Sequence, residues 1–402
     1  MSKWSLFEVF GVELEYMIVN KDTLDVYPLC DEILRKIAGE YVSEIDLGTI
    51  SWCNELVNHV IELKTTTPES KLAPLKQAFA VQVQKINELL SGMNACLMPG
   101  AMHPWMNPHK ETKLWSHEYN PIYEAYNKIF DCRGHGWANL QSTHINLPFK
   151  GDLEFGKLHA AIRFLMPIMP ALTASSPIAD GVFTGQLDYR LHTYRNNAKR
   201  IPIITGKVIP EAVYTWQEYN TEIFQEMYKA IAPFDTEGTL QDEWLNSRGA
   251  IARFDRGSIE IRILDIQECP SADISIVQLI TDSLQRLASG YYGSIPELMQ
   301  WDTERLNLIF TEVCRLGEEA IITDKEYLKH FGIQESSVRA GDLWDLIYEN
   351  SGLELDEIEH ILDSGTLSTR LLHAIDGDYS KEKLKQVWRQ MASCLQNNTM
   401  FE

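Results

Sequence analysis

The sequence predicts an α+β protein, with a sheet-bearing body in residues 1–270 and a mainly helical part in residues 271–402. Three stretches of the first part alternate polar and apolar residues, as strands with one buried face do: GVELEYMIV, STHINLPF and GSIEIRILDI. From about residue 272 the pattern changes to helical spacing, in segments such as DLWDLIYENSG and KEKLKQVWRQMASCL. The boundary is soft, because a helix over 273–290 can pack directly on the sheet and join both parts into one domain.

The elements of the first part follow from local patterns and stop signals. In chain order we expect strands over 4–20 and 56–66, a helix over 70–92, a strand over 142–149 followed by a largely buried helix, and a strand over 257–266. The first helix ends at Gly92, a common helix stop. The last strand has the clearest alternation and is bounded by Gly257 and Pro270.

Composition and charge narrow the class of protein. The 402 residues are 45% hydrophobic and 23% charged, which is typical of a globular chain. Lys and Arg number 36 against 57 Asp and Glu, so the formal net charge is −21. Positive potential does most of the attracting in binding to nucleic acids and anionic membranes. We therefore expect no nucleic-acid partner and no membrane partner.

The N-terminal and cysteine patterns predict a cytoplasmic protein. The opening MSKWSLFEVFGVELEY lacks the charged-then-apolar arrangement of a signal peptide, and the longest apolar stretch is interrupted by prolines. The 7 cysteines are an odd number and include no C-x-x-C pair. This usage argues against a disulfide framework and a zinc site, and it fits a reducing compartment.

Carboxylates share one face of the first predicted strand. Glu13 and Glu15 point to the same side, while Leu14 points to the other. Two like charges on one face repel each other, so this face is either open to water or covered by a cation. The first strand alone leaves both interpretations open.

Other strands repeat this pattern with complementary chemistry. His144 and Asn146 share one face of the strand over 142–149, and Glu260 and Arg262 share one face of the last strand. Glu62 lies between apolar neighbours in VIEL. Several carboxylates on one surface would have raised pKa values unless cations neutralised them, and hard divalent cations, above all Mg²⁺, suit oxygen ligands. Together these faces indicate a site for metal and phosphate chemistry.

Motifs in the first 265 residues resemble the glutamate–cysteine ligase superfamily, with the bacterial carboxylate–amine ligases as the most similar type. In family order, they are GVELE (11–15), ELVNHVIELKTTTP (55–68), AMHPW (101–105), QSTHINLPF (141–149), SSPIADGVFTGQLDYR (175–190) and RFDRGSIEIRILD (253–265). The resemblance implies a fold of the glutamine synthetase/guanido kinase type. In that fold a curved, mainly antiparallel sheet holds ATP, two or three Mg²⁺ ions and the substrate on its concave face, with helices packed around it.

The resemblance also implies roles for individual residues. Arg262 is similar to the catalytic arginine that grips the transferring phosphoryl group, and Arg190 to an arginine that engages the substrate or the phosphate. Arg253 is similar to a nucleotide-phosphate contact, and Asn146 is expected at the substrate. The metal ligands implied in this way are Glu13, Glu15, Glu55, Glu62, His144 and Glu260.

The activity implied by the resemblance is ATP- and Mg²⁺-dependent formation of an amide through an acyl phosphate. The γ-carboxylate of glutamate would be the donor and cysteine, or another amino acid or amine, the acceptor, as in glutathione biosynthesis. A phosphagen-type kinase of the same fold and a non-catalytic ligand-binding relative are the alternatives. The metal-binding glutamates argue against the kinase, which relies on arginines, and the retained site residues argue against the non-catalytic relative. Members of such families often form homo-oligomers, so another copy of the same chain is also an expected partner. The acceptor, the adenine contacts and the choice between Mg²⁺ and Mn²⁺ stay open.

Overall fold

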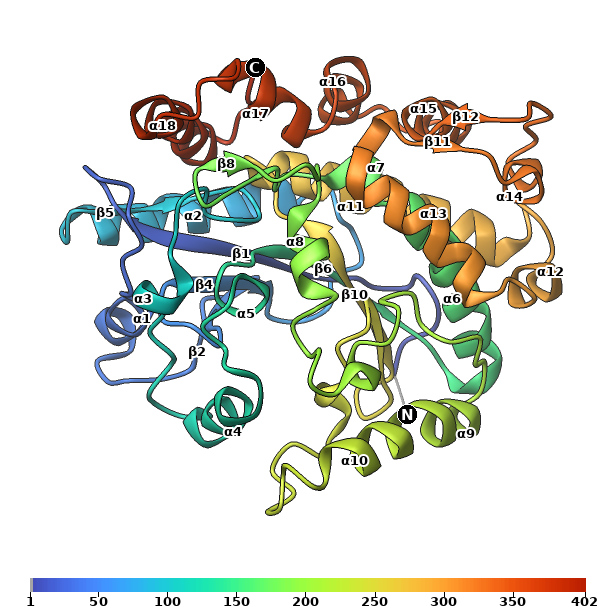
Figure 1. Cartoon of the computed structure of the whole chain (residues 1–402), viewed down its shortest axis with the longest axis horizontal. Helices are drawn as coiled ribbons and strands as arrows, with labels where there is room; N and C mark the ends of the chain where they lie inside the picture. The colour runs from blue at the N-terminus through green and yellow to red at the C-terminus, as the bar shows by residue number, and fades with distance from the viewer. Residues whose placement is uncertain (1–2) are drawn as a thin grey trace.

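The computed structural model describes residues 3–402, and a single large antiparallel sheet runs through its centre (Figure 1). The strand order is β2-β3-β4-β1-β6-β10-β9, and β5 pairs with the far end of β1. The strands are β1 (Gly11–Asn20), β2 (Glu44–Asp46), β3 (Ile50–Asn54), β4 (Val60–Thr65), β5 (Ala95–Met98), β6 (Ser142–Pro148), β9 (Ala250–Arg253) and β10 (Ser258–Asp265). This arrangement confirms the predicted mixed fold with an antiparallel sheet.

One face of the sheet is apolar and buried under helices. Val12 and Leu14 of β1 and Ile145 of β6 are fully buried, and they belong to one core with Phe79 of α2 and Ile274 of α11. Since side chains alternate along a strand, the residues between them point to the opposite face. Packing of the apolar face therefore fixes the direction of the charged one.

The helices of the first part surround the sheet. They are α1 (Cys30–Ala38), α2 (Leu75–Ser91), α3 (Pro108–Glu111), α4 (Asn120–Phe130), α5 (His135–Ala138), α6 (Gly151–Leu165), α7 (Pro170–Thr173), α8 (Tyr189–Tyr194), α9 (Trp216–Tyr219) and α10 (Gln225–Ile231). A small hairpin, β7 (Ile178–Ala179) with β8 (Val182–Phe183), precedes α8.

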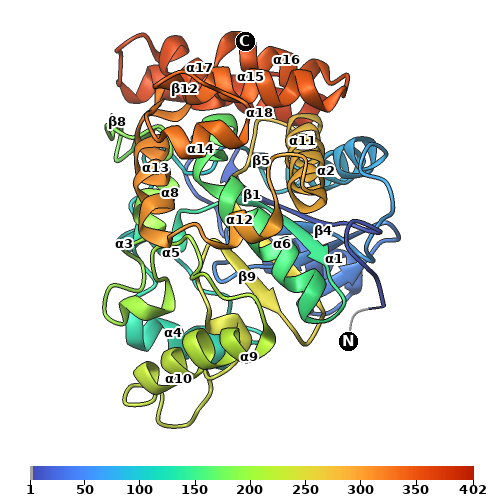
Figure 2. The ribbon, with the colours of Figure 1, turned by 90° about the vertical axis from the view of Figure 1, so that its right-hand side faces the viewer.

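The later part is mainly helical, as predicted, and α15 to α18 lie together along one end of the molecule in both views (Figure 2). Its helices are α11 (Pro270–Ser289), α12 (Ile295–Met299), α13 (Thr303–Leu316), α14 (Lys325–His330), α15 (Ala340–Ser351), α16 (Asp356–Ser364), α17 (Leu367–Ile375) and α18 (Lys381–Asn397). A hairpin of β11 (Ile321–Ile322) and β12 (Val338–Arg339) accompanies them. The core is continuous across both parts, since Trp344 of α15 donates to the Ile168 carbonyl at 2.8 Å. The division at residue 270 stays a prediction.

Some predicted boundaries are wrong, and prolines stand at two of the differences. The first strand begins at Gly11 rather than residue 4, and the helix expected from residue 70 begins at Leu75, after Pro74. The helix after β6 ends at Leu165, where two prolines break the chain into a 3₁₀ turn and the short α7. In the described residues no helix has the length and apolar character needed to cross a membrane.

Candidate active site

Register brings residues far apart in sequence to one face of the sheet. Glu13 of β1 pairs with His144 of β6, and Glu15 of β1 pairs with Glu62 of β4. On the other side of β6, Glu260 of β10 lies opposite Asn146. Directly opposed residues of antiparallel strands have neighbouring Cβ atoms, so four strands deliver one contiguous polar surface.

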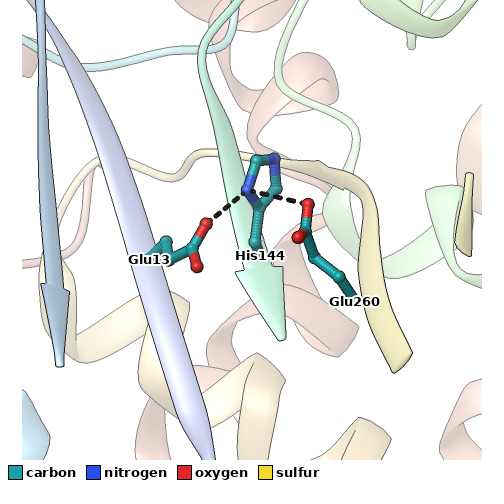
Figure 3. A group of neighbouring side chains, drawn as sticks. All are labelled: Glu13, His144 and Glu260. Carbon is teal, nitrogen blue, oxygen red and sulfur yellow. Dashed lines mark hydrogen bonds and ion pairs between the residues drawn. The ribbon is translucent and has the colours of Figure 1, made fainter. Parts of the chain in front are cut away.

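His144 is the centre of this surface (Figure 3). Its Nδ1 lies 2.8 Å from Glu13 Oε2 and 3.9 Å from Glu260 Oε1, and its Nε2 lies 3.8 Å from Glu15 Oε1. Burial lowers the pKa of His144, but the hydrogen bond to Glu13 and the surrounding carboxylates raise it above its usual range. The imidazole therefore partly compensates the charge of three carboxylates.

Backbone and side-chain donors fix two of these carboxylates. Ser142 donates to Glu15 Oε2 from its amide at 2.7 Å and from its hydroxyl at 2.9 Å, and the same hydroxyl lies 2.9 Å from His144 Nε2. Asn146 donates to Glu13 Oε1 at 2.9 Å. Asn146 is thus directed at a carboxylate rather than at the cavity. Ser142 was not among the predicted site residues, although its place two residues before His144 put it on the same face.

Two groups of side chains have the composition and spacing to hold a cation. In the first, Glu13, His144 and Glu260 each offer a ligand atom within 4.8 Å of the others; in the second, Glu15, Glu62 and His144 do so. The predicted ligand Glu55 lies at the same cavity but outside both groups, with Oε2 accepting from the Leu56 amide at 3.3 Å. The structure therefore brings together five of the six predicted metal ligands in two adjoining groups.

The carboxylates of this surface repel one another, and this repulsion shifts their pKa values. Burial, followed by the charge of Glu15, raises the pKa of Glu55 to about 7. Burial and repulsion by Glu13 and Glu55 raise the pKa of Glu62 well above its usual range. For Glu13 the effect of burial is outweighed by the hydrogen bond and charge of His144, and the pKa falls to about 2. Protein cations alone therefore do not neutralise the surface.

The three predicted arginines have different surroundings. Arg262 donates to Glu260 Oε1 from Nε at 3.1 Å and from Nη2 at 2.6 Å, and its side chain is 25% exposed. Arg190 is buried and forms an ion pair with Asp265, while its Nη2 has no hydrogen-bond partner among residues 3–402. Arg253 lies at the rim, 3.4 Å from an oxygen of Asp255.

A cavity of about 460 Å³ lies over this surface. Its floor contains the carboxylates and arginines described above, and its opposite wall is largely aromatic. That wall was not predicted, and it comes from α4, α5, α8 and the 243–245 turn, with Tyr123, Tyr126, Trp137, Tyr194 and Trp244. Lys64 and Arg256 also line the cavity. Lys64 could have been found from the sequence, because it follows Glu62 by two residues and so shares its face; its Nζ lies 4.0 Å from Glu62 Oε1.

Comparisons with known proteins agree with this geometry. The model of glutamate–cysteine ligase family 2 matches residues 9–389. An uncharacterised protein of Archaeoglobus fulgidus is 31% identical over 398 residues, which cover 98% of this chain and 100% of that protein. A Cupriavidus metallidurans protein provisionally named glutamate–cysteine ligase 2 is 27% identical over 318 residues, covering 77% of this chain and 75% of its own.

Among solved structures, a bifunctional glutathione synthetase from Pasteurella multocida superposes with a TM-score of 0.59 at 15% identity. The match covers 98% of this chain and 53% of that one, so the chain spans about half the length of that structure. At this identity the likeness shows a shared fold.

The antiparallel sheet with its charged face and the family match define an enzyme of the ligase class. The chain belongs to glutamate–cysteine ligase family 2. Its residues outside the match are only the first eight and those after residue 389.

Proposed function

We propose that the protein is an ATP- and Mg²⁺-dependent carboxylate–amine ligase that forms an amide through an acyl phosphate. One observation carries the proposal. Four neighbouring strands place buried carboxylates, the His144 imidazole and the Arg262 guanidinium around a single cavity. The assignments of individual residues below are part of the proposal.

The residues of the sheet fit Mg²⁺. Oxygen atoms dominate both three-residue groups, with His144 as the nitrogen ligand that they share, and hard divalent cations prefer such ligands. The raised pKa values of Glu55 and Glu62 indicate uncompensated negative charge at the same place. When bound, Mg²⁺ neutralises charge on the phosphates of ATP. Glu13, Glu15, Glu62, His144 and Glu260 would hold it, with Glu55 at the edge.

ATP is needed because a carboxylate is a poor electrophile. In the first step a carboxylate oxygen attacks the γ-phosphorus, the bond to the bridging oxygen breaks, and ADP leaves with the electron pair. In the second step the amine attacks the carbonyl carbon of the acyl phosphate, the bond from that carbon to the phosphate oxygen breaks, inorganic phosphate leaves with the electron pair, and the nitrogen loses a proton. The first step brings two anions together, so charge neutralisation and in-line positioning supply most of the catalysis.

The arginines of the cavity can supply this charge neutralisation and positioning. Arg262 is partly exposed to the cavity and can offer two parallel N–H donors to phosphoryl oxygens. Arg190 lies at the cavity with one unpartnered nitrogen, Nη2, which suits a substrate carboxylate or a phosphate oxygen. Arg253, at the rim, suits a phosphate nearer the nucleotide. Asn146 acts through Glu13 and orients that carboxylate.

Glutamate is the proposed source of the carboxylate, and cysteine is the first amine acceptor to test. The support is family membership and the names of relatives such as the Cupriavidus metallidurans protein. The aromatic wall of the cavity suits the apolar body of an acceptor or the base of the nucleotide.

The test is ADP release from Mg·ATP with glutamate against a panel of amino acids and simple amines. Glu62→Ala is the blank, and Glu118→Gln, which changes an exposed carboxylate outside the cavity, is the matched control. Release that requires glutamate and one acceptor, with the amide seen by mass spectrometry, supports the proposal. ADP release that never exceeds the Glu62→Ala blank with any pair of substrates contradicts it.

A further inference from the structure

Arg262 donates hydrogen bonds to the same Glu260 oxygen that would ligate a cation. Both Nε and Nη2 donate to Glu260 Oε1, at 3.1 and 2.6 Å. That oxygen is also the one 3.9 Å from His144 Nδ1, on the side where Glu13, His144 and Glu260 form a group (Figure 3). A divalent cation on this group competes with the guanidinium for Glu260 and repels its positive charge. Arg262 would then need another partner.

The backbone of Arg262 is fixed, so only its side chain can respond. Its amide donates to the Gly249 carbonyl at 2.9 Å, and its own carbonyl accepts from Arg190 Nη1 at 3.3 Å. Arg190 is itself anchored by its ion pair with Asp265. The pairing of β10 with β6 is irregular between Ile261 and Leu264, so Arg262 lies in a bulge, a feature that redirects side chains.

Tyr194 offers the missing partner. It lies one helical turn after Arg190 on α8, lines the cavity and is 9% exposed. Its hydroxyl interacts with the Arg262 guanidinium but completes no hydrogen bond of normal geometry in the described structure. A buried hydroxyl without a hydrogen bond is rare in folded proteins and calls for an explanation. Its oxygen can accept from an arginine N–H, whereas the ring has no other polar group.

We propose that Tyr194 is a positioning residue for Arg262: when a divalent cation engages Glu260, the guanidinium transfers to the Tyr194 hydroxyl oxygen and stays aimed into the cavity. The inference rests on the proposed function, because it assumes that the Glu260 group takes a cation and that Arg262 serves phosphoryl transfer. It adds a residue from a helix outside the sheet to the site. It also gives Glu260 two roles, since this carboxylate would hold Arg262 before the cation binds and a metal afterwards.

The variant Tyr194→Phe tests the inference, because it removes only a hydroxyl that completes no hydrogen bond of normal geometry among the described residues. Tyr189→Phe is the matched control: it lies on the same helix, stacks on His192 and does not line the cavity. We expect kcat for ADP release to fall about ten-fold in Tyr194→Phe, the loss of one charge-assisted hydrogen bond. The KM for ATP and for the carboxylate should stay within about two-fold of wild type, since ground-state binding does not need the new contact. Melting temperatures should match.

A second measurement does not depend on turnover. Ultraviolet difference spectra are recorded as Mg²⁺ is added to the enzyme with ADP, each against the same mixture without Mg²⁺. A tyrosine difference band that appears in wild type and Tyr189→Phe, and is absent in Tyr194→Phe, supports the transfer. A band that persists in Tyr194→Phe, a wild type without any band, or kcat within two-fold of wild type overturns it. If the wild type shows the band but no ligase activity, the proposed function fails while the positioning role stands.

Discussion

Glu62 is buried among like charges, so a substitution there tests whether its carboxylate serves a cation or the fold. Its carboxyl is buried beside Glu13 and Glu55, and these neighbours raise its pKa well above the usual range. A neutral amide of the same shape relieves that repulsion and removes a proposed metal ligand. We expect Glu62→Gln to lose at least about 100-fold in ADP release, since even indirect changes at metal sites cost 10–100-fold. Its melting temperature without Mg²⁺ should equal or exceed that of wild type.

The measurement pairs steady-state kinetics with thermal melts, and Glu260→Ala serves as a second ligand variant, for which the fold should also stay intact. Glu118→Gln is again the control, with both properties unchanged. A large fall in the metal-free melting temperature of Glu62→Gln would show that this side chain supports packing rather than a ligand.

A substitution at Arg262 separates the contribution of hydrogen-bond geometry from that of positive charge. Two N–H groups of its guanidinium donate together to Glu260 Oε1, and the side chain lines the cavity. Lysine keeps the charge but cannot supply parallel donors. We expect Arg262→Lys to lower kcat about 100-fold, a loss of roughly two hydrogen bonds to charged groups. Arg133→Lys, a change at an exposed arginine, should retain full activity. Most of the wild-type turnover in Arg262→Lys would rule out the bidentate role.

At the scale of elements, alternation of polar and apolar residues predicted β1, β6 and β10, because one face of each is buried and the other carries the site. It missed β3, Ile50–Asn54, where all five residues are buried and the strand has no exposed polar face. The short β9 was missed for the same reason. The polar face of a strand therefore indicated both the strand itself and the position of the site.

The approach of β10 to the preceding loop depends on Gly249. A Cβ atom there would come within 2.7 Å of both Met166 Cε and Val208 Cγ1, and it would also collide with Ile263 of β10. The Gly249 carbonyl accepts a hydrogen bond from the amide of Arg262 at 2.9 Å, so relief of the collision moves the backbone that carries this proposed phosphoryl-binding arginine. We expect Gly249→Ala to destabilise the fold by about 1–3 kcal/mol, the usual cost of overpacking, and to lower kcat.

The comparison is Gly134→Ala, where an added Cβ meets no atom of the described part of the chain within 4 Å. Denaturant unfolding and ADP release are measured for both variants. Equal stability and activity of Gly249→Ala and Gly134→Ala would mean that the loop adjusts without disturbing β10.

At the scale of the whole molecule, the sequence could predict the floor of the site but not its wall. Strand periodicity places carboxylates on a common face wherever the strands pair, so the floor needs only local patterns. The wall joins Tyr126 of α4, Trp137 of α5 and Trp244, and more than a hundred residues of sequence separate Trp244 from the other two. Each aromatic residue is individually typical of a core position, and only the tertiary fold decides which of them face the cavity.

Buried histidines make the stability of the whole fold depend on pH. Burial lowers the pKa of His59 and His103 to about 4 and that of His159 to about 3, against 6.5 for an unhindered imidazole. Below pH 6.5 the unfolded chain binds protons that the folded chain does not, so acid favours unfolding. The stability from keeping these rings neutral is complete above about pH 6.5 and is lost progressively as the pH falls toward 4 and 3.

The variant His159→Gln isolates one of these groups. His159 donates from Nδ1 to the Val213 carbonyl, 2.7 Å away, and glutamine keeps a donor for that carbonyl without a group that titrates. We expect the melting temperature of wild type to fall between pH 6.5 and pH 4.5 more steeply than that of His159→Gln, whatever the difference between them at pH 7.5. His109→Gln, a change at an exposed histidine, should keep the wild-type slope. All three are measured in the same concentration of Mg²⁺, so that the carboxylates of the active site contribute equally. Identical slopes for wild type and His159→Gln would mean that this ring can be protonated inside the fold, and that the core around it admits water or a counter-charge.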